Sequence, residues 1–443
     1  MKEQFLHFLW KNLLFDRQAL VTSGNVPVEV INPGSYNRDS GPDFFNSRIR
    51  IGKTEWAGNV EIHTKSSHWY MHGHNLDHAY DNVILHVVNE HDREVYTAAG
   101  TMVETALLVW DESYYNRWQE FLHAPDTIAC SKDLQLVDPF TILQWVSRVA
   151  TDRLEEKSRR LKPLLRELHN DWEETLYRLI SRYYGMNVNS DPFYMLASRV
   201  PLKLVRKHSD NPLQVESLFY GQAGMLEEGL FREACEDDYY NMLVREYRVL
   251  KSKYSLVPMD GWVWKYHRMR PGNFPGIRIS QLASLLMLND HLFARVRDEC
   301  STGLLLDIFR TRSSDYWDTH YTFGHKAGNA GKRLGKAAAI VIIVNCVVPL
   351  IYLYGMETGG RGFCSRAVEI AEELPAEDNR ILREWKASGV IPISAFESQG
   401  LLGLREGLCK NRDCLNCHIG TKLISLGKDS DPRSKLVLED PLT

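Results

Sequence analysis

The sequence lacks a surplus of charge of either sign. Its 53 Lys and Arg residues are matched by 57 Asp and Glu residues, so the formal net charge of the 443-residue chain is −4. This balance excludes a protein whose whole surface is basic and binds nucleic acid, although it does not exclude a local basic groove. The chain also contains no internal repeat and no low-complexity segment, and its 44% hydrophobic residues are ordinary for a globular protein. We therefore expect two or three globular domains.

Several nucleotide-binding and hydrolase motifs are also missing. The stretch GHKAGNAGKRLGKA has three residues between Gly331 and the Gly335-Lys336 pair, where a P-loop has four, and Ala337 replaces the hydroxyl residue. The sequence contains no nucleophile elbow and no dinucleotide-binding fingerprint. ATP binding and serine-hydrolase chemistry are therefore not supported.

Long hydrophobic runs are scarce. The N-terminal stretch MKEQFLHFLWKNLLF contains Glu3, His7 and Lys11 and has no small-residue cleavage site, so we expect no signal peptide and a cytoplasmic protein. One apolar run, residues 337–355, approaches the length of a membrane span, but Asn345 and Pro349 interrupt it. We interpret it as a buried core helix or helix pair and expect no membrane association.

The hydrophobic periodicity changes along the chain. In the first ~115 residues a helix at 5–15 is followed by strands at 26–31, from Phe44 and at 58–65, then by a short helical turn and a strand at 82–88. From about Pro139 onward the pattern is helical. We therefore predict an α+β or α/β protein with a small mixed-sheet domain (1–115), a helical domain (116–330) and a helical C-terminal segment (331–443).

Two carboxylates lie on neighbouring predicted strands. Asp43 follows a Gly-Pro turn and opens one strand, and Glu61 lies inside the next. If these strands pair, both carboxylates reach the same end of the sheet, where they can share a divalent cation. His63 and Lys65 follow Glu61 at intervals of two, so they point to the same face. A structural role on the sheet face would explain the same residues.

This arrangement resembles the PD-(D/E)xK phosphodiesterase superfamily, which has a restriction-endonuclease-like fold. The resemblance implies that Asp43 and Glu61 bind Mg²⁺ or Mn²⁺, and that a lysine two residues after the Glu activates water. Here His63 occupies that position, and Lys65 lies one repeat further along. The first helix of such folds often supplies another acid, which would be Glu3.

A second resemblance covers nearly the whole chain. The segments NRDSGPDF, GNVEIHTKSSHW, HGHNLDHAYDNVILHVVNEHD, RMRPGNFPGIRISQLA and SQGLLGL, with the later CLNCHIG, look like the uncharacterised bacterial family called domain of unknown function 2851. That family has no established activity, so this resemblance implies membership without a mechanism.

Six of the 16 histidines lie between His63 and His86. His72, His74, Asp77 and His78 form H-x-H-x-x-D-H, which has one residue more than the motif of metallo-β-lactamase-like hydrolases. The His72, His74 and Asp77 cluster can hold zinc or another transition metal, or it can form a polar loop whose histidines cap backbone groups. His86, alone in an apolar strand, is expected to be a core histidine.

Three cysteines are clustered near the C-terminus. The stretch CKNRDCLNCHIG places Cys409, Cys414 and Cys417 within nine residues, and we expect them to bind a metal for structural reasons. Zinc or an iron–sulfur cluster would fit. Cys364, His418 or a more distant residue is the candidate for the fourth ligand.

The segment WVWKYHRMRPGNFPGIR interleaves aromatic residues with Lys265, Arg268, Arg270 and Arg278. Cations that hold phosphates and rings that stack on bases are typical of single-strand binding, although an ordinary exposed loop has the same composition. The sequence therefore favours a metal-dependent, nuclease-like phosphodiesterase acting on DNA or RNA. The alternatives are a non-catalytic nucleic-acid-binding or scaffold protein, and a zinc hydrolase. The sequence decides neither whether the protein is an enzyme nor its oligomeric state.

Overall fold

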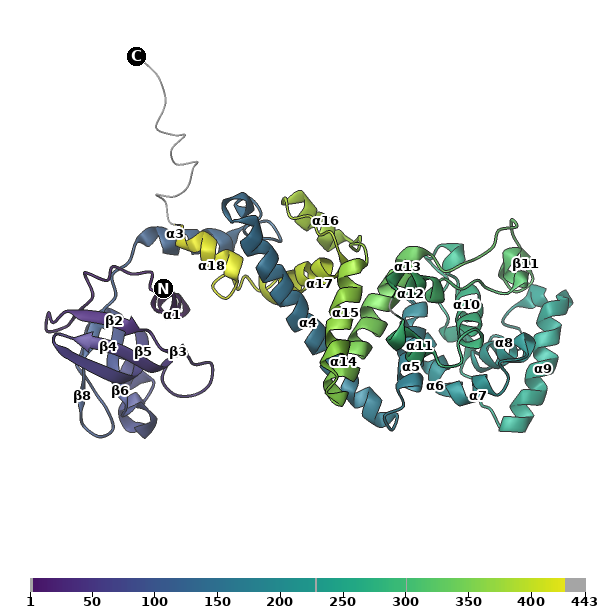
Figure 1. The fold of residues 1–443 in the computed structure, drawn as a ribbon, viewed down its shortest axis with the longest axis horizontal. Coiled ribbons are helices and arrows are strands. Elements are labelled where there is room, and N and C mark those ends of the chain that lie inside the picture. The colour runs from purple at the N-terminus through teal and green to yellow at the C-terminus, as the bar shows by residue number, and fades with distance from the viewer. Residues whose placement is uncertain (1–2, 228, 300, 427–443) are drawn as a thin grey trace, which may run out of the picture. The chain divides into compact units, whose positions relative to one another are not determined.

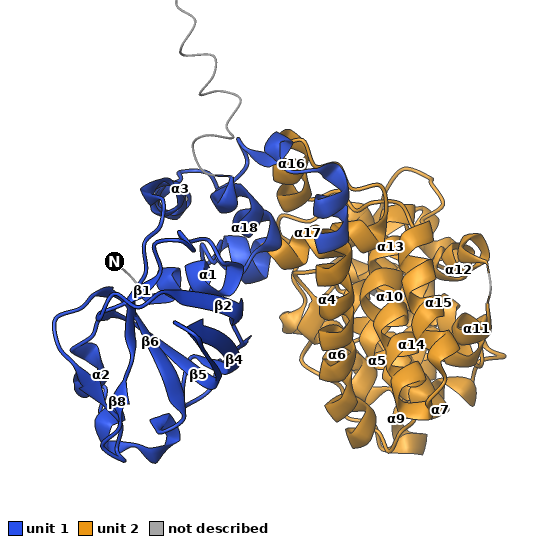
Figure 2. Ribbon diagram, turned by 60° about the vertical axis from the view of Figure 1, so that its left-hand side comes forward, with its two compact units in different colours: residues 1–145, 405–443 blue, residues 146–404 orange. Residues whose placement is uncertain are grey.

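The structure is a computed structural model that describes residues 3–227, 229–299 and 301–426 (Figure 1). The chain forms two compact units: unit 1 comprises residues 1–145 with 405–443, and unit 2 comprises residues 146–404 (Figure 2). This division differs from the three segments expected from the sequence. Of the predicted C-terminal segment (331–443), only the part from residue 405 joins the N-terminal domain, because its helix α18 (His418–Ser425) packs against α3 (Glu112–His123). Residues 331–404 belong to unit 2.

Unit 1 contains a mixed seven-stranded sheet in the order β1-β9-β6-β5-β4-β2, with β3 also paired to β4. Its strands are β1 (Val21–Thr22), β2 (Val28–Asn32), β3 (Ser35–Tyr36), β4 (Phe44–Ile51), β5 (Thr54–Lys65), β6 (Val83–Glu90) and β9 (Thr105–Leu107). Strands β2, β4 and β5 are antiparallel neighbours, whereas β5, β6 and β9 run parallel to one another. The mixed α+β character predicted for the N-terminal region is confirmed.

Because β5 and β6 are parallel, the chain must cross back between them, and it does so through short helical elements. They lie where the sequence predicted a helical turn. These are α2 (His68–Met71) and the 3₁₀ helices η1 (His74–Leu76) and η2 (His78–Tyr80). The rest of unit 1 comprises α1 (Glu3–Asn12), the hairpin β7 (Val95–Tyr96) and β8 (Met102–Val103), α3, η3 (Leu134–Leu136), the start of α4 (Pro139–Glu167), a π-helical turn at Arg405–Cys409 and α18.

Helix α1 covers the strands that carry the candidate site. It packs on β5 and fully buries Phe5, Leu6 and Leu9. Residues 58–63 of β5 are buried on both faces, so alternate residues face different surroundings. Val60 and Ile62 belong to the apolar set, while Glu61 and His63 point to the other face. A buried carboxylate and imidazole there require partners.

The described residues of unit 2 form helices and one short hairpin, and the helical prediction for this part is confirmed. Its elements are the remainder of α4, α5 (Trp172–Tyr184), α6 (Ser190–Arg199), α7 (Leu202–Arg206), α8 (Pro212–Gln222), η4 (Arg232–Glu236), α9 (Asp238–Tyr254), η5 (Gly261–Val263), η6 (Pro271–Asn273), α10 (Pro275–Met287), α11 (Leu292–Asp298), α12 (Thr302–Phe309), η7 (Asp315–Asp318), β10 (His320–Thr322), β11 (His325–Lys326), α13 (Lys336–Ile342), a π-helical turn (Ile343–Val347), α14 (Val348–Thr358), α15 (Arg361–Glu373), α16 (Arg380–Ala387) and α17 (Ala395–Leu404).

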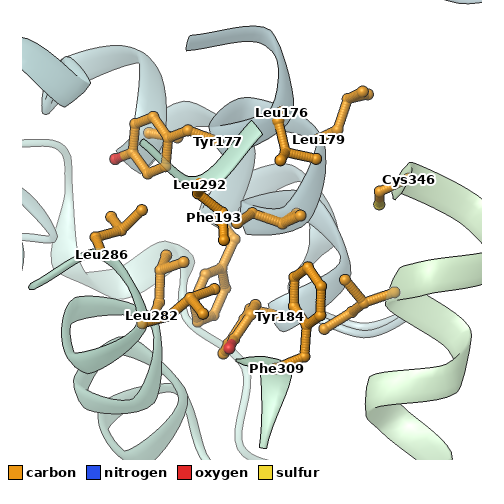
Figure 3. Packing of buried hydrophobic residues seen from close by; sticks show 14 of the residues in the cluster. Leu176, Tyr177, Leu179, Tyr184, Phe193, Leu282, Leu286, Leu292, Phe309 and Cys346 are labelled. Carbon is orange, nitrogen blue, oxygen red and sulfur yellow. The ribbon is translucent and has the colours of Figure 1, made fainter. Parts of the chain in front are cut away.

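A large apolar cluster holds the helices of unit 2 together. Tyr184 of α5, Phe193 of α6, Leu282 of α10 and Phe309 of α12 point toward one another in its centre (Figure 3). Several helices begin with side chains that accept a hydrogen bond from the first turn, such as Asp171 before α5. Unit 2 therefore has its own core and its own local start signals.

Helix α13, the π-helical turn and α14 form one continuous apolar rod. Among the described residues it is the one helix long and apolar enough to cross a membrane, and 67% of its most apolar window is buried inside the protein. Its polar interruption, Asn345, accepts a hydrogen bond from Lys157 Nζ at 2.7 Å. The rod is thus packed as a core helix, which passes the same test of length and composition.

Candidate metal centre

Asp43 and Glu61 lie side by side in unit 1. Asp43 directly precedes β4 and Glu61 lies in β5. The backbone N–H of Asp43 donates to Glu61 Oε2 at 3.0 Å, and the N–H of Ile62 donates to Asp43 Oδ2 at 2.9 Å. Each carboxylate is therefore held by the backbone of the other strand, so the structure brings together the two acids that the strand pattern singled out.

His63 and Glu3 face the same point. His63 Nε2 lies 3.5 Å from Glu61 Oε1 and 3.8 Å from Glu3 Oε1. The His63 side chain is 1% exposed, because α1 and the segment after β5 cover it. The predicted placement of Glu3 on the first helix, beside the acids of the strands, agrees with these distances.

The turn after α2 adds two more imidazoles. Gly73 has a left-handed φ of 76°, which favours glycine, and it separates the two histidines. His72 Nδ1 lies 3.0 Å from His63 Nε2, and His74 Nε2 lies 3.2 Å from Glu61 Oε1. One nitrogen from each of His63, His72 and His74 lies within 4.8 Å of the other two. The acidic pair and the histidine cluster, which the sequence treated as separate candidates, form one site.

Two members of this site were not assigned to it from the sequence. His7 Nε2 lies 3.2 Å from Asp43 Oδ2. The sequence indicated this position through the four-residue spacing from Glu3, because residues four apart lie on the same face of a helix. His86 is fully buried, as expected of a core histidine, but its Nε2 lies 2.8 Å from His63 Nδ1. It therefore orients a residue of the site.

The donor atoms of the site fit a cation. Glu3 Oε1 and His74 Nε2 are buried and have no hydrogen-bond partner within the protein. In the tautomer that donates Nδ1–H to His86, His63 presents a lone pair at Nε2, toward Glu61 Oε1 and His72. Lone pairs converging in a buried site repel one another unless a cation lies among them.

The electrostatics of the site follow from this crowding. Burial, together with the charge on Asp43, raises the pKa of Glu61 to about 9. Burial and the neighbouring imidazoles, foremost that of His86, lower the pKa of His63. Burial also lowers the pKa of His74. Without a cation, Glu61 is held protonated and the imidazoles of His63 and His74 are held neutral, whereas a bound cation favours the deprotonated carboxylate.

Three imidazoles and several carboxylates are a mixed nitrogen and oxygen donor set. Zinc, manganese and iron accept such a set, whereas magnesium prefers oxygen ligands and water. His63, His72, His74 and Glu61 would hold the ion directly, with Glu3 and Asp43 beside them. A transition metal therefore fits the residues better than the magnesium considered from the sequence.

Two residues assigned to the site from the sequence lie elsewhere. Lys65 is exposed and its Nζ lies 2.9 Å from Glu90 Oε1, because the parallel register of β5 and β6 places these residues opposite each other. Asp77 is exposed and accepts a hydrogen bond from the N–H of Ala79, which caps η2. Lys65 as a catalytic residue and Asp77 as a ligand are therefore corrected.

The predicted nucleic-acid-binding segment is in unit 2, and the structure divides its residues. Lys265, Arg268 and Arg270 are exposed, as is Trp262 at 76%. Arg278 is 5% exposed in α10, and its guanidinium donates to Asn273 Oδ1 at 2.6 Å. Arg278 is therefore a structural residue, and the other three cations form the remaining basic patch.

The three C-terminal cysteines lie in unit 1 and Cys364 lies in unit 2. Cys364 Sγ donates to the carbonyl of Tyr352 at 3.6 Å, so α14 and α15 account for its position. His418 is exposed and its ring lies beside that of Trp145. Cys364 as the fourth ligand of the cysteine triad stays a prediction.

A cavity of about 370 Å³ opens beside α1. It shares His7 with the candidate metal centre, and its wall includes Lys11, Tyr36, Arg412 and Asn416. Lys11 Nζ lies over the Tyr36 ring, 5.7 Å from its centroid. The cavity therefore combines two cations and an aromatic ring next to the site.

Comparison with known proteins places the chain in one family. Residues 3–380 match the model of the family described as protein of unknown function (DUF2851), and the chain belongs to that family. No curated protein and no solved structure matches the chain.

Proposed function

We propose that the protein is a metal-dependent phosphodiesterase acting on nucleic acid. The observation that carries this proposal is the meeting of Asp43 and Glu61 with the imidazoles of His63, His72 and His74 around unpartnered buried donor atoms. The placement of the residues supports it too: a helix carrying Glu3 lies beside two neighbouring strands whose acids are Asp43 and Glu61, as the PD-(D/E)xK resemblance implies.

In this proposal His63, His72, His74 and Glu61 would hold a cation, which would supply Lewis-acid polarisation of the phosphodiester and a water of lowered pKa. The chain itself supplies the remaining parts. Backbone N–H groups fix the Asp43 and Glu61 carboxylates, and His86 fixes the ring of His63 through Nδ1. Burial of these groups keeps bulk water away from most of the donor set, while Glu3 and His72 remain partly exposed and provide access.

The substrate class is inferred from the charges around the site. Lys11 and Arg412 in the neighbouring cavity wall match a phosphate backbone, and Tyr36 offers a ring. In unit 2, Lys265, Arg268 and Arg270 beside the exposed Trp262 form a second patch of the same character. These residues favour nucleic acid over a small neutral substrate.

The zinc-hydrolase alternative now uses the same centre, because His72 and His74 lie against Glu61. The two functions differ only in substrate. Cleavage of single- and double-stranded DNA and RNA should therefore be measured with Mn²⁺, Zn²⁺ and Mg²⁺, beside a small phosphodiester and a small carboxylic ester. We expect nucleic-acid cleavage with Mn²⁺ or Zn²⁺ that Asp43→Asn and Glu61→Gln abolish.

Cleavage of the small carboxylic ester alone would favour the zinc hydrolase. Nucleic-acid binding without cleavage under any metal would favour the scaffold alternative. The basic patch supplies an independent check, since Trp262→Ala should weaken single-strand binding by about 1–3 kcal/mol through loss of base stacking. Asp77→Asn is the matched control for the metal centre, because its carboxylate caps η2 and lies outside the converging donors.

A further inference from the structure

The cavity beside α1 is formed by segments from both ends of the chain. Its wall combines residues of α1, β3 and α3 with the loop 411–416, all within unit 1. Arg412 of this loop has a left-handed φ of 55°, and its Nη2 donates to the carbonyl of Ala124, the C-cap of α3, at 2.7 Å. A non-glycine residue keeps this costly conformation where its surroundings fix it, so the fold itself builds this wall.

Two cations line the cavity without carboxylate partners. Lys11 and Arg412 form no ion pair among the described residues. Lys11 lies over the Tyr36 ring, and Nη1 of Arg412 is buried without a hydrogen-bond partner in the described part of the chain. The wall also contains Asp413, whose Oδ1 accepts from Asn416 Nδ2 at 2.8 Å. Positive charge therefore exceeds negative charge in the wall, and a guanidinium with donors to spare is well suited to phosphate.

The remaining wall is suited to a flat ring. Tyr36 is half-buried and lines the cavity, and the buried side chains of Phe8 and Trp118 complete an aromatic lining. Aromatic side chains stack on nucleobases of any kind, because every base has a π-face. A phosphate ion alone would leave this lining unused. A ligand that carries both a phosphate and a base would use all of it.

The volume of the cavity restricts the ligand to a single unit. At about 370 Å³ it lies near the lower end of the range for small-molecule sites, roughly 300–1,000 Å³. Grooves that follow a single strand hold about 4–16 nucleotides. The cavity is therefore too small to be such a groove, and its size fits one nucleotide.

His7 lies between this cavity and the candidate metal centre. It lines the cavity, its Nδ1 lies 3.4 Å from Tyr36 Oη, and its Nε2 lies 3.2 Å from Asp43 Oδ2. A ligand in the cavity is thus one side chain away from the acids of the metal centre. A strand whose last nucleotide occupies the cavity would bring its adjoining phosphodiester toward those acids.

We propose that this cavity binds one nucleoside monophosphate unit, with its phosphate held by Lys11 and Arg412 and its base against Tyr36. Two sources present this unit, namely the phosphorylated end of a strand and a free mononucleotide. The strand end rests on the proposed phosphodiesterase function. Hydrolysis there breaks one P–O bond of the adjoining phosphodiester: water gives its hydroxyl to phosphorus and a proton to the leaving oxygen, and one mononucleotide is released.

The first test is isothermal titration of the full-length, metal-free protein with dAMP, deoxyadenosine and inorganic phosphate. We expect dAMP to bind at least about 10-fold more tightly than either fragment, because only dAMP uses both the cations and the ring. Lys11→Met and Tyr36→Leu should each weaken dAMP binding about 10-fold. Lys65→Met is the matched control and should bind as wild type does, because Lys65 is exposed and paired with Glu90. No binding of dAMP, or equal affinity in wild type and Lys11→Met, would overturn the proposal.

A second experiment distinguishes the two sources of the ligand. Linear single strands with a 5′- or 3′-phosphate and the same strand circularised compete with dAMP, and each is then incubated with Mn²⁺. Displacement of dAMP by a linear strand but not by the circle assigns the cavity to strand ends, and we expect mononucleotides as the cleavage products. Displacement by neither strand supports the free mononucleotide as the ligand. Displacement by the circle as strong as that by the linear strands would overturn the single-unit cavity.

The two proposals fail in different ways. If no strand is cleaved under any metal while dAMP binds and Lys11→Met weakens that binding, the phosphodiesterase function is wrong and the nucleotide cavity stands. If strands are cleaved but dAMP does not bind, the cavity proposal is wrong and the phosphodiesterase function stands.

Discussion

Two buried glutamates, one in each unit, show what separates a structural carboxyl group from a functional one. Glu216 in α8 is 3% exposed and Glu61 in β5 is 5% exposed, and burial raises the pKa of both. Glu216 accepts hydrogen bonds from the hydroxyls of Ser280 and Tyr239, so both of its oxygens are satisfied by donors. Glu61 instead faces a second carboxylate and imidazole nitrogens. In its surroundings Glu3 Oε1 and His74 Nε2 are buried without a hydrogen-bond partner. Burial alone therefore does not identify a site, whereas convergence of acceptors does.

The largest expected effect tests this contrast directly. Glu61→Gln removes a negative ligand and should weaken binding of Mn²⁺ or Zn²⁺ by more than about 100-fold, with loss of nucleic-acid cleavage. Glu216→Gln should leave metal binding unchanged and lower the free energy of unfolding by about 1–3 kcal/mol, because it disturbs a satisfied buried network. Isothermal titration with metal and thermal unfolding measure the two effects. Equal metal affinity in Glu61→Gln and Glu216→Gln would show that Glu61 is not a metal ligand.

The next largest effect is a difference in metal affinity between variants of two histidines, His72 and His78, in the segment between β5 and β6. His72→Ala removes one of the three converging nitrogens and should weaken metal binding about 10–100-fold. His78→Ala is the matched control, because His78 is exposed and bonds to Asp81 Oδ2 at 2.7 Å. Elemental analysis after dialysis against a limited metal supply would detect the difference. If both variants kept the wild-type metal content, the ion would have to lie outside the histidine group.

A pH series sharpens the comparison in the metal-free protein. Because the pKa of Glu61 is raised from 4.5 to about 9, the folded state holds a proton there that the unfolded state has released. The stabilising contribution of this proton is full below about pH 4.5 and is lost as the pH rises toward 9. Thermal unfolding should show this decline in wild type and a smaller one in Glu61→Gln. Saturating Mn²⁺ should reduce it, since the cation binds the deprotonated form.

The sequence predicted those parts of the site that local periodicity determines. The alternation of β5 placed Glu61 and His63 on one face, and the turn before Phe44 brought Asp43 to the neighbouring strand. The same patterns predicted α1, β2, β4, β5 and β6 in their order, but not the short strands β1, β3, β7, β8 and β9. His7 was missed although it lies four residues from Glu3, because the helix was interpreted through its apolar face.

Long-range pairing could not be predicted in the same way. Nothing in the sequence near α3 indicates that Ala124, at its end, accepts a hydrogen bond from Arg412, because that contact depends on the packing of α18 against α3. The same return of the chain places the part of the C-terminal segment from residue 405 in unit 1, which the sequence did not indicate. Arg278 was misjudged because an arginine in an aromatic-rich segment looks the same in sequence whether it faces solvent or Asn273.

The smallest expected effect concerns Lys65, whose period of two places it on the face of Glu61. The alternation continues along β5, but the surroundings change: residue 61 is covered, whereas residue 65 is exposed and paired with Glu90 across the parallel register. Lys65→Met should therefore leave the metal affinity and the cleavage rate unchanged within error, while His63→Ala abolishes both. Parallel titrations and nuclease assays compare them. If Lys65→Met lowered the cleavage rate as much as His63→Ala, the Lys65 side chain would have to leave Glu90 when substrate binds. An exposed residue of β5 would then take part in the reaction, and burial would not be needed for a functional role on this strand.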